Sequence, residues 1–481
     1  MLASLSASIS AQNSQVLYYM NLPQNHLLNP AMRPSNSLYI GLPVISGINL
    51  NINNNFFRFS DVFKNSTTSD SVMTFLDPRM NINDFIGKIN DKNSFEPDLS
   101  VQLFGLGFNV GKDLYVFLDI NDRIDGNIVL PGDIFKFALL GNAGFKGGQI
   151  DLSSFRTDVK YYREIGFGFS KNFTNKLRIG VKGKILSGIA TASIDNKSFG
   201  ISISDSYTHT IDADLVANIS APLTITKNTA NDITDVKFDD SALKNANGIS
   251  DFFMGKENKG LGIDIGATYS VTPKFVVSAA ITDIGYIKWK KNVNNIEVKG
   301  HYVFNGIDLH SIFNDTTPIG EINPGQAILD SIKKDFKVTD SKNVFTTYLP
   351  FGITLGGSYN LTKAFSVGLL SYSRVIGKQV RESMTASANL NIGNAFSTSF
   401  TYTMANNQYD NLGAGIAFRP GIFQFYLLAD RIPVTWNKLE SGNSTIPIPA
   451  SVNTINLRLG MNIAFGNKAK KKQDKPMLKV E

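Results

Sequence analysis

Long segments of strictly alternating residues constrain the fold of this chain more than any other feature. In residues 260–271, GLGIDIGATYSV, apolar or aromatic side chains take every second position, and glycine or polar residues lie between them. A period of two residues is typical of a β-strand with two different faces. The environment of the apolar face therefore decides the fold class, and that face consists of Leu261, Ile263, Ile265, Ala267, Tyr269 and Val271.

The same unit recurs along the chain as pairs of alternating strands joined by short turns. Residues 164–186, 351–370 and 411–429 each repeat a glycine-rich first strand, a turn and a second alternating strand, and residues 455–465 form a last strand. Most of these segments run ten residues or more, whereas soluble strands average about 5–6 residues and a tilted membrane strand needs about 9–11. The pattern predicts an antiparallel transmembrane β-barrel whose apolar faces contact lipid. Glycine on the opposite face would permit the close approach of a plug.

The composition agrees with a barrel and excludes several other classes. No segment of the 481 residues approaches the roughly 18 consecutive apolar residues of a membrane-spanning helix. Barrels expose only every second residue to lipid, so 42% hydrophobic residues are sufficient. The chain has no cysteine, which excludes disulfides and thiolate chemistry.

The connections between strands predict an orientation. From residue 347 onward, one end of the strands carries tight turns at 361–363, 393–394 and 419–421, and the other end carries longer connections at 376–382, 405–410 and 432–452. Outer-membrane barrels have short periplasmic turns and long external loops. Because the last strand runs toward the tight turns, we expect the outer membrane as location and a periplasmic tail over 467–481.

The tail and two internal segments complete this map. Six lysines against Asp474 and Glu481 give the tail +4 of the net charge of +7, which suits a solvated terminus or a docking segment for anionic lipid or a partner. No basic stripe elsewhere indicates nucleic-acid binding. Residues 131–142 and 323–336 have helical spacing, and 336–339 is the expected crossing between the strands at 296–305 and 347–361.

The sequence carries no catalytic motif, and we expect no enzyme activity, no cofactor and no metal site. The four histidines are scattered. Several charged residues alternate with apolar ones and would face the lumen, where they either pair with one another or line a substrate path. The candidates are Asp264, Arg178, Lys182, Lys184 and Arg458, with Glu164, Asp212 and Asp214 on the same predicted faces; Tyr286, Trp289, Tyr372 and Tyr402 lie near strand ends, as in an aromatic girdle.

The N-terminal part of the chain resembles a known family. Residues 16–43, VLYYMNLPQNHLLNPAMRPSNSLYIGLP, precede hairpins such as FGITLGGSYNLTKAFSVG and the segment DIGYIKWKKN. Together they resemble the FadL-like outer-membrane barrels of Bacteroidota, and more narrowly an uncharacterised family distantly similar to PorV and PorP/SprF-type proteins. The resemblance implies about 14 strands and a plug segment in the lumen, on which Asn29, Pro30 and Ala31 match the Asn-Pro-Ala segment.

These observations predict one barrel over residues 37–466, a plug segment over 12–36 and, over 1–11, the remnant of a signal peptide ending near Ala11-Gln12. The leading function is a FadL-like channel or transporter for small hydrophobic or amphipathic compounds. The alternative is a barrel that acts as a partner or shuttle for secretion-system proteins of the type IX secretion or gliding machinery. A soluble multi-sheet β protein is the third hypothesis, and the absence of a ~40–50-residue repeat argues against a propeller.

Overall fold

Antiparallel strands form a closed ring in the computed structural model. The structure describes residues 15–56, 58–65, 72–227, 233–239, 257–304, 336–405, 408–433, 436–441, 444–449 and 453–466. Within these residues the wall has fourteen strand positions, as predicted. In order around the ring they are β1 (Leu38–Gly41) with β2 (Ile48–Asn54), β5 (Lys92–Val110), β6 (Leu114–Pro131), β8 (Arg156–Asn172), β9 (Leu177–Ile203), β13 (Lys259–Ser270), β14 (Phe275–Trp289), β17 (Phe345–Tyr348) with β18 (Phe351–Asn360), β19 (Phe365–Ile376), β20 (Gln379–Ile392), β21 (Phe396–Ala405), β22 (Gln408–Phe418), β23 (Phe423–Ile432) and β26 (Thr454–Phe465).

The two ends of the wall meet at one seam. β26 pairs with β1 and β2, and both of these pair with β5 on their other side, so no edge strand is left in the ring. Closure satisfies the backbone hydrogen bonds of every wall strand without water.

The apolar face of the opening segment points outward, as the alternation predicts. Leu261 is 57% exposed and Ile265 is 47% exposed, whereas Asp264 between them is fully buried. The same division holds around the ring: Phe167, Leu369 and Phe400 are each about 60% exposed on other strands. A ring of large apolar side chains on the exterior, with polar residues inside, is the arrangement of a membrane barrel.

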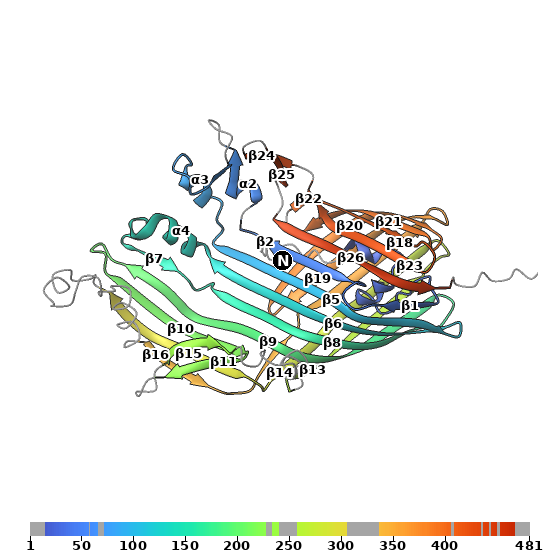
Figure 1. Ribbon diagram of the computed structural model, residues 1–481, viewed down its shortest axis with the longest axis horizontal. Coiled ribbons are helices and arrows are strands. Elements are labelled where there is room, and N and C mark those ends of the chain that lie inside the picture. Colours follow the sequence, from blue (N-terminus) through green and yellow to red (C-terminus); the bar gives the residue numbers. More distant parts are fainter. Residues whose placement is uncertain are drawn as a thin grey trace, which may run out of the picture.

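Tight turns lie together at one end of the barrel. Residues 111–113, 173–176, 271–274, 361–364, 393–395 and 419–422 each join neighbouring strands there, and β26 ends there as well. β1 and the end of β26 mark this end of the barrel on the right of Figure 1. At the opposite end, 376–382 is not the long loop that we expected, because β19 and β20 continue to a two-residue turn at Gly377 and Lys378.

The opposite end carries an extension of the sheet (Figure 1, left). β9 continues past the wall and pairs with β10 (His209–Ser220), which pairs with β15 (Val293–Phe304), which pairs with β16 (Phe336–Ser341). The predicted crossings at 296–305 and 336–339 are therefore wrong: β15 and β16 pair outside the ring. β7 (Gly148–Asp151) also pairs with β9.

Small elements surround the same end. Three two-stranded ribbons lie outside the main sheet, and the helices of this end precede β5 or follow β6. These elements are β3 (Phe63–Asn65) with β4 (Val72–Thr74), β11 (Leu223–Lys227) with β12 (Ile233–Phe238), β24 (Trp436–Ser441) with β25 (Ser444–Pro449), and the helices α2 (Phe59–Val62), α3 (Ile82–Ile86), α4 (Gly132–Leu140) and η2 (Gly141–Phe145).

One predicted helix is confirmed and the other lies outside the described residues. α4 begins after Pro131 and ends at Gly141, whose φ of +64° suits glycine. Residues 323–335 of the second helix are not described, and neither are 1–14 and the tail 467–481. None of the helices in the described ranges has the length and apolar character needed to span a membrane.

Candidate functional site

The N-terminal segment, residues 15–36, lies inside the barrel. It contains α1 (Gln15–Tyr18) and η1 (Pro23–Leu27), and most of its side chains are buried. Its hydrogen bonds reach strands on all sides of the ring. Gln15 Nε2 donates to Ser383 Oγ (3.0 Å), the Val16 N–H to Asp430 Oδ1 (2.7 Å), Gln24 Nε2 to Asn462 Oδ1 (2.8 Å) and Ser170 Oγ to the Ala31 carbonyl (3.0 Å), and the hydroxyls of Tyr18 and Ser278 lie 2.7 Å apart.

Two paired glycines make room for the Asn29-Pro30-Ala31 triplet. Gly180 on β9 and Gly266 on β13 are direct register partners. A Cβ on Gly180 would lie 2.2 Å from the carbonyl carbon of Pro30, and one on Gly266 would lie 2.1 Å from Asn29 Oδ1. Any larger residue would clash, so the glycine alternation of the opening segment permits the close approach of the N-terminal segment.

Apolar residues of the segment pack on the far side of the lumen. Val16, Leu17, Met20 and Leu22 form one buried cluster with Ala417, Tyr426 and Leu428 of β22 and β23. Glycines again allow the contact, since a Cβ on Gly415 would lie 2.5 Å from Val16 Cγ1. Hydroxyl and amide side chains of β20 and β21 surround this area, and Thr385 Oγ1 lies 2.9 Å from Thr403 Oγ1.

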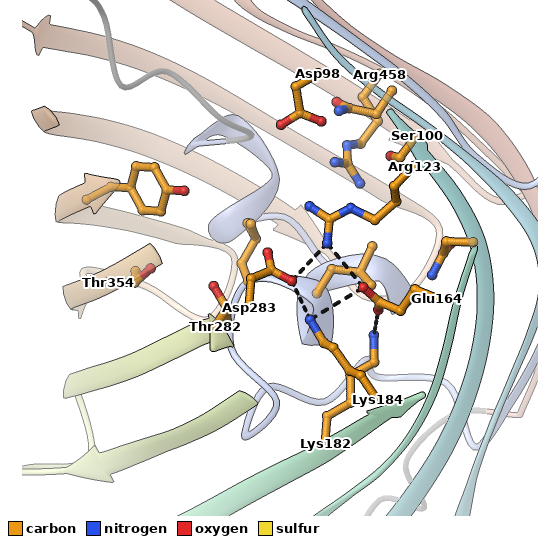
Figure 2. Close-up of a pocket in the computed structure, with 15 residues that line it drawn as sticks. Asp98, Ser100, Arg123, Glu164, Lys182, Lys184, Thr282, Asp283, Thr354 and Arg458 are labelled. Atoms are coloured by element: carbon orange, nitrogen blue, oxygen red, sulfur yellow. Dashed lines mark hydrogen bonds and ion pairs between the residues drawn. The ribbon is translucent and has the colours of Figure 1, made fainter. Parts of the chain in front are cut away.

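A network of buried charges occupies the opposite side of the lumen (Figure 2). Eight groups from the N-terminal segment and five neighbouring strands are joined by contacts of 2.5–3.5 Å. We call this set the charge network. Its basic members are His26, Arg123, Lys182 and Lys184, and its carboxylates are Asp119, Glu164, Asp264 and Asp283.

His26 connects the charge network to the N-terminal segment. Its Nε2 lies 2.7 Å from Asp119 Oδ2, and its Nδ1 lies 2.5 Å from the carbonyl oxygen of Pro23. His26 therefore links the N-terminal segment to Asp119 of β6 and, through Asp119, to Lys182 of β9.

Three of the five predicted lumen residues meet in this network. Lys184 Nζ lies 2.8 Å from Asp264 Oδ1 and 2.5 Å from Asp283 Oδ1, so the partner of Asp264 is Lys184. Lys182 Nζ lies 2.7 Å from Glu164 Oε1. Arg178 lies apart, near the tight turns, where its Nε donates to Asn172 Oδ1 (2.8 Å).

Two arginines cross the lumen. Arg374 on β19 contacts Asp98 on β5 (3.4 Å) and Asp125 on β6. β19 and β5 are seven positions apart in either direction around the fourteen-position ring, so this contact spans the barrel. Arg381 on β20 contacts Glu96 on β5, further toward the extension. These bridges lie between the charge network and the extension end.

The site residues predicted from the sequence did not include Arg123, Asp283, His26 or the two crossing arginines. A signal for Asp283 exists, because Ile281 and Ile284 both point outward although they are three residues apart. The alternation shifts phase there at a β-bulge, where Asp283 has a φ of +66° and its N–H donates to Asp264 Oδ1 (2.6 Å). No comparable signal marks Arg374, because its partners follow from closure of the ring.

Cavities lie on both sides of the crossing arginines. One of about 60 Å³ lies between Arg374 and the charge network, and Arg458 is among its lining residues. A larger one of about 510 Å³ lies at the extension end and is lined by residues of β6, β8, β9, β10, β17, β19 and β20. Among the described residues, no group of three or more histidine or carboxylate side chains is arranged to hold a metal ion.

Four predicted positions differ from expectation, two of them outside the lumen and two away from the exterior. Asp212 and Asp214 belong to β10 of the extension, where they contact His301 and two lysines. Trp289 is fully buried and Tyr372 is 9% exposed, so the expected aromatic girdle keeps only Tyr286 and Tyr402 on the exterior.

Comparison with solved structures shows similarity to bacterial transport proteins at low identity. The Ralstonia pickettii toluene transporter TbuX is similar over 97% of this chain and 98% of that chain, with 10% identity and a TM-score of 0.40. A Pseudomonas aeruginosa FadL homologue is similar over 96% of this chain and 100% of that chain, with 8% identity and a TM-score of 0.42. The Pseudomonas putida toluene transporter TodX is similar over 95% and 93%, with 10% identity and a TM-score of 0.34.

Among curated proteins, no sequence matches this chain. A family model does match, over residues 30–430, which include most of the wall strands and the Pro30 and Ala31 positions of the triplet. The expected relation to PorV and PorP/SprF-type proteins stays a prediction. With more than half of its length matched, the chain belongs to the family described as "Family of unknown function (DUF5723)".

Proposed function

We propose that this protein is a non-enzymatic outer-membrane channel that passes small hydrophobic or amphipathic compounds and is closed at rest by its N-terminal segment. The apolar exterior supports the membrane location, since a ring of exposed Phe, Leu and Ile side chains of this size would be unstable in water. In this orientation the tight turns and the tail 467–481 face the periplasm, and the extension faces the outside.

The position of residues 15–36 carries the proposal. The segment fills the lumen at the tight-turn end, and its contacts with the wall include hydrogen bonds and glycine contacts that can be broken without unfolding a strand. The cavity of about 510 Å³ at the extension end is large enough for a small organic compound. A compound that enters there meets the crossing arginines and then the N-terminal segment.

The test is permeation through reconstituted barrels with and without the segment. Deletion of residues 15–36 should increase the swelling rate of liposomes in arabinose several-fold over the intact protein. Uptake of the hydrophobic probe N-phenyl-1-naphthylamine by cells that carry the intact protein in their outer membrane should exceed uptake by cells without it. The channel proposal is wrong if the intact protein and the deletion variant both fold, swell liposomes at the same rate, and the intact protein does not increase uptake of the probe. That result would support the secretion-partner alternative.

A single substitution provides a milder version of the same test. Gly180→Ala places a Cβ 2.2 Å from Pro30 and should displace the triplet, whereas Gly183→Ala on the same strand meets nothing within 4 Å. We expect faster swelling with Gly180→Ala and an unchanged rate with Gly183→Ala.

A further inference from the structure

The cavity of about 60 Å³ contains hydrogen-bond donors that no protein group satisfies. Arg458 on β26 lines it, has no ion pair within the described residues, and its Nε is buried without an acceptor. Asn121 on β6 lines the same cavity, is 6% exposed, and its Nδ2 is also without an acceptor. Leaving such donors buried and unpaired is unfavourable, so a site that holds them is suited to an acceptor.

The carboxylates of the cavity do not fill this role. Asp98 contacts Arg374, and Glu164 and Asp283 each contact Arg123 and Lys184. Arg374 faces two carboxylates, Asp98 and Asp125, so the charge of Arg458 is balanced only at a distance. Within the described residues, the guanidinium of Arg458 thus lacks an anion in contact.

Strand register brings a second arginine to the same wall. Arg458 pairs with Asn49, Asn49 with Ser100, and Ser100 with Arg123, in one row across four neighbouring strands. Three strand spacings separate the two arginines, about 14–15 Å along the curved wall. In Figure 2 both guanidinium groups point from the wall toward the cavity, with Ser100 near them.

We propose that Arg458 and Asn121 bind the carboxylate headgroup of an amphipathic compound in this cavity. This inference rests on the proposed channel function and assigns its substrate class. A guanidinium binds a carboxylate by two parallel hydrogen bonds, which a neutral hydroxyl cannot match. At about 10–15 Å³ for each water-sized group, the cavity accepts a headgroup of about four to six heavy atoms but not a whole alkyl chain. The chain of the ligand would extend past the crossing arginines toward the larger cavity.

Calorimetric titration of the intact protein in lipid nanodiscs tests the site, with empty nanodiscs as the reference and a buffer free of other carboxylates. The probes are octanoate, acetate, octan-1-ol and octylammonium. We expect saturable binding of octanoate, weaker binding of acetate, and no saturable binding of the alcohol or the ammonium. Acetate that binds as tightly as octanoate would show a site for free small anions and overturn the amphiphile assignment. Equal binding of all three eight-carbon probes, or none of octanoate, would overturn the proposal.

Variants locate the binding. Arg458→Gln should weaken octanoate binding about tenfold or more, Asn121→Leu less, and Arg458→Lys should restore part of the loss. Arg178→Gln is the matched control, because Arg178 lies in the lumen outside the cavity. Unchanged binding in folded Arg458→Gln and Asn121→Leu would exclude this site. Arabinose swelling of the deletion variant is independent of these titrations, so the site can fail while the channel proposal stands.

Discussion

The two sides of the lumen hold the N-terminal segment by different physical means. On the side of β6 to β14, the charge network reaches the segment through His26 and consists of basic and acidic side chains in direct contact. On the side of β20 to β23, short hydroxyl and glycine residues leave space that Val16, Met20 and Leu22 fill. One side depends on charge balance and the other on packing.

This difference predicts unequal sensitivity to substitution. Removing one member of a buried ion pair leaves its partner uncompensated in a medium of low dielectric constant, which is costly. A change in packing is partly relieved by small shifts of neighbouring atoms. Substitutions on the charged side should therefore have the larger effects on the free energy of unfolding, and four comparisons test this expectation in descending order.

The largest effect is expected at Lys184, which contacts three carboxylates. Lys184→Met should lower the free energy of unfolding by about 3–5 kcal/mol, because Asp264 and its neighbours lose their counter-charge. Urea unfolding in lipid vesicles measures this value. Lys299→Met on the exposed extension, where the lysine side chain is 67% exposed beside Asp214, is the control and should change it by about 1 kcal/mol or less. Equal effects of the two variants would contradict the distinction.

A smaller effect is expected on the packed side. Gly415→Ala places a Cβ 2.5 Å from Val16 Cγ1 and 2.6 Å from Met20 Sδ, and should lower the free energy of unfolding by about 1–3 kcal/mol. Gly357→Ala, where the nearest atom would be 3.7 Å away, serves as the control in the same urea titration. A larger loss for Gly415→Ala than for Lys184→Met would reverse the proposed order.

A single hydrogen bond on the packed side should matter less again. Thr385→Val removes one partner of the contact with Thr403 and should cost about 1 kcal/mol. The double variant Thr385→Val with Thr403→Val should cost less than the sum of the two single variants, since no hydroxyl is then left unpaired. If the double variant loses as much unfolding free energy as the two single variants together, the hydrogen bond between Thr385 and Thr403 does not contribute to stability.

The smallest effect is expected in the extension. His301 Nδ1 lies 2.7 Å from Asp212 Oδ1, but both side chains are more than half exposed. His301→Gln should change the free energy of unfolding by less than about 1 kcal/mol, because water screens the pair. A loss comparable with that of Lys184→Met would mean that the extension is part of the stabilising network.

Local alternation was sufficient to predict the wall and its faces. Leu261, Ile263 and Ile265 point outward and Asp264 points inward because a strand can arrange alternating residues in only one way around a closed barrel. Glycines on the inner face were expected to permit the close approach of a plug. The Asn29-Pro30-Ala31 triplet lies against two such glycines, Gly180 and Gly266.

Long-range contacts could not be predicted in this way. The contact between Arg374 and Asp98 joins residues 276 positions apart, and it exists because the ring places their strands on opposite sides. β15 and β16 alternate like wall strands, so only the pairing of β15 with β10 and of β16 with β15 reveals that they lie in the extension. His26 was one of four scattered histidines until the position of the N-terminal segment brought it to Asp119.

Hydrogen exchange of the backbone amides of residues 15–36 tests the central claim that both sides of the lumen hold this segment. In the intact protein in nanodiscs, we predict protection close to that of the wall strands. Lys182→Met, which removes the cation shared by Asp119 and Glu164, should selectively lower the protection of the segment and leave the protection of β20–β23 unchanged. Rapid exchange of residues 15–36 in the intact protein, with protected wall strands, would contradict the account.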